Sequence, residues 1–117
     1  ELAFKKHDQK IISSIVIIVR AMKEEQCDLS EGCWRLCVLL ESLKLADNIK
    51  EKFPAIFSLY NAIKHMPILA ERKKLPKKER MKLDYQRMKI EADLSDKIQI
   101  DLNLLHEFAN DTLITLS

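Results

Sequence analysis

The chain has 117 residues, of which 47% are hydrophobic and 32% charged, and its formal net charge is +2. This length allows one hydrophobic core, and the composition is typical of a globular domain rather than a disordered or membrane-spanning chain. Because Gly32 is the single glycine, the sequence lacks the glycines of a dinucleotide fingerprint, a P-loop or a nucleophile elbow. We predict an all-α fold: a compact bundle of five or six helices, the last one or two of them long.

The first predicted helix covers residues 8–24, where the apolar residues share one helical face: Ile11, Ile12, Ile15, Ile18, Val19 and Met22. A second helix is predicted to begin at Asp28-Leu29-Ser30-Glu31, with Asp28 as the N-cap and Glu31 reaching back to it. Gly32 falls in the first turn of this helix. Since glycine is unfavourable inside a helix, we expect it to serve close packing or the helix entrance.

Prolines divide the middle of the chain. Pro54 suits the first turn of a helix, so we predict a short helix over about 48–52 and a longer one from Pro54. Pro67 ends or bends that longer helix. Residues 68–75 form at most a short helical turn, and Pro76 begins another segment.

The C-terminal third carries two apolar patterns. Met81, Tyr85, Met88 and Ala92 follow 4-3-4 spacing, and the phase shifts at Asp93-Leu94-Ser95-Asp96 before the pattern resumes through Leu113. One long kinked helix or two helices would satisfy these patterns, and we favour two. The adaptable or bulky apolar residues most useful at a protein interface are Trp34, Phe57, Met66, Met81 and Met88. We expect most of them to be core, and Met66 and Ile68, which flank Pro67, to be the first candidates for exposure.

We interpret residues 1–117 as one domain, excised from a longer protein because the chain begins at Glu1 rather than Met. No apolar run exceeds five residues, so no transmembrane helix is predicted. Cys27, Cys33 and Cys37 lie within eleven residues of one another without a C-x-x-C knuckle. They are therefore interpreted as reduced, structural cysteines of an intracellular protein and not as metal ligands.

Nothing in the sequence points to catalysis. The three histidines, His7, His65 and His106, have no recognisable nucleophile or carboxylate partner, and the acidic residues show no acid–base arrangement. We therefore predict that the domain is not an enzyme and has no catalytic residues, no metal and no cofactor.

The charge is unevenly distributed along the chain. Residues 71–91 contain nine Lys or Arg and four Asp or Glu, and residues 92–117 contain one Lys and five acids. A solvated helix face is the simplest reading. One alternative is a nucleic-acid-associated module that uses the basic segment 72–89, with contacts from Arg72, Lys73, Lys74, Lys77, Lys78 and Arg80. Another is self-association through residues 76–116, where the spacing is partly heptad-like and a homodimer would result.

Residues 28–66 resemble the family of the TFIIS N-terminal domain and the integrase-binding domain of lens epithelium-derived growth factor. The resemblance rests on Asp28-Leu29, Cys33, Leu40-Glu41-Ser42-Leu43, Ile49 and the stretch from Ile56 to Lys64. It implies a bundle whose inter-helix loops hold short peptides of transcription and chromatin proteins, and hence favours a nuclear over a cytoplasmic location. It also implies partner contacts from Glu25 and Met66, with Ile68 close by. Glu24 stands where the family has an isoleucine.

Together these observations predict a non-enzymatic protein-interaction module. Its partner is expected to be a helix or short linear motif of another protein, held by an apolar groove with charged surroundings.

Overall fold

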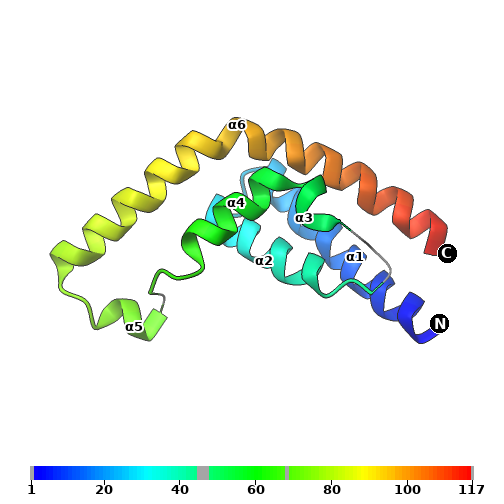
Figure 1. Cartoon of the computed structure of the whole chain (residues 1–117), viewed down its shortest axis with the longest axis horizontal. Coiled ribbons are helices and arrows are strands. Elements are labelled where there is room, and N and C mark those ends of the chain that lie inside the picture. Colours follow the sequence, from blue (N-terminus) through cyan, green and yellow to red (C-terminus); the bar gives the residue numbers. More distant parts are fainter. Residues whose placement is uncertain (1, 45–47, 68, 117) are drawn as a thin grey trace.

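A computed structural model describes residues 2–44, 48–67 and 69–116 of the chain. The described residues form six helices and no strand, which confirms the all-α prediction (Figure 1). In chain order these are α1 (Leu2–Lys23), α2 (Leu29–Glu41), α3 (Ile49–Lys52), α4 (Pro54–Ile63), α5 (Leu69–Lys73) and α6 (Lys77–Leu116). Within this described part, no helix combines the length and the apolar character needed to cross a bilayer.

The core lies between four of the helices. α1 packs against α2 and α6, and α4 packs against the same two helices. Removing their apolar faces from water is the main force holding the bundle together. The side chains that are fully enclosed there include Ile12, Ile15, Val19, Leu36, Ile56, Leu59, Leu102 and Leu105.

The prolines set helix boundaries as predicted. α3 is a single turn that begins after Asn48, a residue in the left-handed conformation with φ 59°. Pro54 opens α4 at the position where its missing N–H costs nothing. α5 occupies five residues between Pro67 and Pro76.

The start of α2 differs in part from the prediction. Asp28 is at the N-cap position, but its side chain makes no capping hydrogen bond. Instead, the carboxylate of Glu91, on α6, accepts hydrogen bonds from Ser30 N and Ser30 Oγ, at 3.3 Å and 2.9 Å. The predicted close packing of Gly32 is confirmed, because a Cβ there would lie 2.6 Å from Met22 Cγ.

The prediction of two C-terminal helices is wrong, since α6 is continuous over 40 residues. The Asp-Leu-Ser-Asp tetrapeptide at 93–96 contains neither proline nor glycine, so nothing in it forces a break. Four buried residues just beyond it, Ile98, Leu102, Leu105 and Ala109, share one helical face and hold the helix on the bundle. At about 1.5 Å per residue such a helix measures about 60 Å, more than the 51 Å long axis of the molecule.

α6 curves with its convex side away from the other helices (Figure 1). Its first buried residue is Ile98, so residues 77–97, here called the arm, have no buried side chain. The expectation that Met81 and Met88 are core is therefore wrong: each is 62% exposed, and Tyr85 between them is 69% exposed. Helical spacing alone does not distinguish an apolar face packed on a core from one left in solvent.

Candidate functional site

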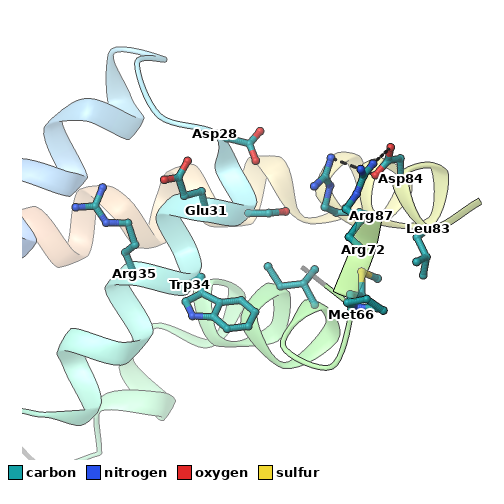
Figure 2. A pocket seen from close by; sticks show the side chains of 12 residues that line it. Asp28, Glu31, Trp34, Arg35, Met66, Arg72, Leu83, Asp84 and Arg87 are labelled. Atoms are coloured by element: carbon teal, nitrogen blue, oxygen red, sulfur yellow. Dashed lines mark hydrogen bonds and ion pairs between the residues drawn. The ribbon is translucent and has the colours of Figure 1, made fainter. Parts of the chain in front are cut away.

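A cleft of about 520 Å³ opens between α2, the end of α4, α5 and the arm (Figure 2). Its walls come from four separate stretches of the chain, which Pro67 and the turn before α6 bring together. The lining residues are Asp28, Ser30, Glu31, Trp34, Arg35, Ile63, Met66, Pro67, Arg72, Leu83, Asp84 and Arg87.

Apolar side chains form one wall of this cleft. Trp34 extends from α2 toward the side on which Met66 and Leu83 lie (Figure 2). The indole is held edge-on against Tyr60, with ring centroids 5.6 Å apart and planes at 88°. Such an edge-to-face pair fixes the orientation of the indole and leaves the rest of its surface for contact.

Charged side chains surround the apolar wall. Asp28, Glu31 and Arg35 lie on the α2 side. Across the cleft, Asp84 accepts a hydrogen bond of 2.5 Å from Arg72 Nη2, and Arg87 Nη2 is 3.8 Å from the other carboxylate oxygen. The hydrogen bond from Arg72, assisted by the positive charge of both arginines, lowers the pKa of Asp84. These contacts attach α5 to the arm.

The arm is also attached to α2 from within the cleft. Ser30 belongs to the lining and is bound by Glu91, as described above. Arg87 Nε lies 4.0 Å from the other oxygen of the same carboxylate. The Arg72–Asp84 ion pair connects α5 to the arm and the Glu91–Ser30 contact connects the arm to α2, whereas the two ion pairs of Arg87 lie within the arm.

A second, shallower hollow of about 460 Å³ lies between α1 and α2. It shares Trp34 and Arg35 with the cleft, and its other lining residues are Ser14, Ile17, Ile18, Val38 and Leu39. Ile17 is 68% exposed and Val38 46% exposed. The apolar surface around Trp34 therefore extends in two directions along α2.

The structure places the predicted partner contacts in different parts of the molecule. Met66 lies in the cleft, as a partner contact would require. Glu25 is exposed in the turn between α1 and α2 and is not among the residues that line the cleft. Ile68 lies outside the described residues. Sequence reasoning did not place Trp34 and Leu83 in one cleft, because residues so far apart in sequence give no local signal that they line the same site.

The residues of the predicted basic surface also lie in two different places. Arg72 is part of the cleft and paired with Asp84. Lys73, Lys74, Lys77 and Lys78 are exposed around the connection from α5 to α6, and Arg80 is half-buried. They form an open positive surface beside the cleft and are separate from its apolar wall.

The cysteines are free, with Cys33 and Cys37 buried in the core and Cys27 half-buried. Burial raises the pKa of the Cys33 thiol to about 12 and also raises that of Cys37. A thiol so protonated at neutral pH is a poor nucleophile and a poor metal ligand. Among the described residues, no three His, Cys, Asp or Glu side chains are grouped so that they could hold a metal ion.

Comparison with known proteins identifies the family of this chain. Residues 1–105 match the family described as "Protein of unknown function (DUF2489)". The chain belongs to the DUF2489 family. An uncharacterized protein of Haemophilus influenzae is 39% identical over 110 residues, which cover 92% of this chain and 73% of that protein. No solved structure matches this DUF2489 chain.

Membership of DUF2489 corrects two expectations. The resemblance to the TFIIS N-terminal domain family is wrong, since its matches were mostly apolar positions that any bundle of short helices shares. The nuclear location implied by it is also wrong, because the Haemophilus relative comes from a bacterium, which has no nucleus.

Proposed function

We propose that this DUF2489 domain is a non-enzymatic protein-interaction module whose cleft holds a helix or short linear motif of another protein. The observation that carries the proposal is the apolar wall of Trp34, Met66 and Leu83 inside a charged rim. Large apolar anchors in a pocket supply most of the binding energy at interfaces, and surrounding charges steer association. Tryptophan and methionine are well suited to such a wall, since one is rigid and the other adaptable.

A helical partner fits this surface better than an extended segment that inserts a single side chain. The second hollow continues the apolar surface from Trp34 to Ile17 and Val38. An amphipathic helix presents anchors one or two turns apart, and could fill the cleft with one anchor while another covers Val38.

The proposal is tested by placing a photo-reactive amino acid at Met66 or Leu83 in the bacterial cell and mapping the crosslinked peptides. We expect one partner segment to be recovered from both positions. Phe4 is the matched control, because it is an apolar residue that is 51% exposed and lies near the start of α1, away from the cleft. Recovery of the same segments from Phe4, or of none from the cleft, would contradict this choice of site.

Nucleic-acid binding is a second candidate, favoured by the four exposed lysines Lys73, Lys74, Lys77 and Lys78. Phosphate contacts of this kind weaken steeply as salt rises. Titration of a labelled oligonucleotide at low and high salt tests it, with Lys73→Gln/Lys74→Gln compared with wild type. A complete lack of binding at low salt would eliminate this candidate.

A further inference from the structure

The outward face of α6 carries a row of exposed apolar residues. Six large apolar side chains of this helix are 48% to 75% exposed: Met81, Tyr85, Met88, Ile100, Leu104 and Ile114. All six fall on one line of steps of three or four residues, completed by Ala92, Asp96, Glu107 and Asp111, all of them also exposed. The mean step of about 3.7 residues is close to the helical repeat, so the line runs along one side of the helix. We call it the outer stripe.

The outer stripe is symmetric about Asp96. Ala92 and Ile100 stand four residues on either side of it, and Met88 and Leu104 stand eight residues away. Further out, Tyr85 mirrors Glu107 and Met81 mirrors Asp111. In an antiparallel pair of these helices, apolar residues therefore meet near the centre, where Met88 of one copy lies opposite Leu104 of the other. The twofold axis generates this contact twice.

The charges favour the same antiparallel arrangement. Within α6, residues 77–91 have six Lys or Arg and three acids, a difference of +3, whereas residues 101–115 have three acids and no Lys or Arg, a difference of −3. Antiparallel pairing about Asp96 places these two segments opposite each other. Asp111 of the second copy, which mirrors Met81, then lies next to Lys82 in the basic half. Parallel pairing would instead place like charges opposite each other along both the basic and the acidic half of the helix.

We propose that two copies of this domain associate through the outer stripe, with α6 antiparallel to α6 of the second copy and a twofold axis beside Asp96. Because α6 is convex on its outer side (Figure 1), contact concentrates near the middle, between Met88 and Leu104. The area buried is smaller than in obligate dimers, and the association is correspondingly weak, in the micromolar range of about 10 to 100 µM.

This dimer is independent of the proposed cleft. Leu83, Asp84 and Arg87 face the cleft, whereas Met81, Tyr85 and Met88 lie exposed on the outer stripe. Substitutions in one set leave the other available, so failure of the dimer and failure of partner binding are separately observable.

Sedimentation equilibrium from micromolar to near-millimolar concentrations tests the stripe. We expect a monomer–dimer equilibrium in the wild type and at least about tenfold weaker association in Met88→Gln/Leu104→Gln. Phe4→Gln is the matched control, since this apolar residue of α1 is exposed to a similar degree, 51%, and lies outside both hollows. A persistent monomer, or equal weakening by the control, overturns the proposal. Unchanged circular dichroism and thermal melting show that each variant remains folded.

Two charge experiments test the antiparallel register. Asp96→Asn removes the pair of like charges at the axis, so association should strengthen several-fold, whereas Asp93→Asn, off the stripe, should leave it unchanged. Lys82→Glu and Asp111→Lys should each weaken the dimer, and both together in one chain should restore it. Absence of that restoration overturns the register. The proposal that a second copy covers the outer stripe is overturned if the chain stays monomeric and instead binds an oligonucleotide or an acidic helical peptide through Lys82.

Discussion

Asp101, on α6, accepts a hydrogen bond of 2.7 Å from the backbone amide of Ala55, in the first turn of α4. The same carboxylate oxygen accepts from Ile56 N at 3.2 Å. Since Pro54 has no N–H, these are the first two amides of α4 that need an acceptor. The negative charge also complements the positive end of the α4 dipole. A residue 46 positions away thus caps a helix that has no local side-chain cap.

Loss of this cap should destabilise the fold strongly, because Asp101 is only 5% exposed. We expect Asp101→Ala to lower the free energy of unfolding by about 3 kcal/mol, since two buried donors lose a charged acceptor. Asp101→Asn keeps one acceptor oxygen and should cost about half as much. Asp93→Ala, an exposed change on the same helix, is the control. Urea denaturation measures all three, and equal effects of Asp101→Ala and Asp93→Ala would contradict the capping role.

Gly32 and Met22 should be energetically coupled. A methyl group on Gly32 would overlap the Met22 side chain, which is 4% exposed. We expect Gly32→Ala to destabilise the fold by about 1 kcal/mol, because overpacking outweighs the gain in helix propensity. In a Met22→Ala background the same change should become stabilising by about 0.5–1 kcal/mol. A double-mutant cycle measured by chemical denaturation would reveal this change of sign, and additive effects would contradict the contact.

Glu25 should be replaceable with a gain in stability. Its φ is 57°, and the bonds Gln26 N to Ala21 O (2.8 Å) and Glu25 N to Met22 O (3.2 Å) form a Schellman motif at the end of α1. Glycine is preferred at this left-handed position, so Glu25→Gly should stabilise the domain by about 0.5–1 kcal/mol. Glu24→Gly, still within the helical bonding of α1, should destabilise it instead. Thermal melting of the two variants would show opposite shifts.

The buried cysteines predict a loss of stability in alkali. Burial raises the pKa of Cys33 from 9.0 to about 12, so the folded protein keeps a proton that the unfolded chain releases. The contribution of this thiol is therefore fully present below pH 9 and is lost as pH rises toward 12. Urea midpoints at neutral and alkaline pH, compared between wild type and Cys33→Ala, would separate the effect of this thiol from the titration of lysine and tyrosine side chains. Equal pH dependence in both proteins would refute the prediction.

Most of the fold was predictable from local sequence signals. The prolines at 54, 67 and 76 and the apolar spacing of the first helices specify where α3 to α5 begin and end. Met66 was predicted as a partner contact and does line the cleft. These features depend on residues within a few turns of one another.

The remaining features depend on contacts between distant residues. The caps of α2 and α4 come from Glu91 and Asp101, so neither can be read from the sequence around those helices. Likewise, Trp34 and the arm line one cleft although they are distant in the sequence. The exposure of Met81 and Met88 could not be predicted, because their spacing would be the same on a buried helix.

The two caps supplied by α6 have a consequence for how the chain folds during synthesis. The ribosome releases α1 to α5 before the residues that complete the amino ends of α2 and α4 have been made. Until then those helices hold unsatisfied amides, and the apolar faces of α1 and α4 that pack on α6 remain in water. We expect the nascent domain to stay labile to proteolysis until Asp101 and the buried residues after it emerge, so that folding is committed only late in translation.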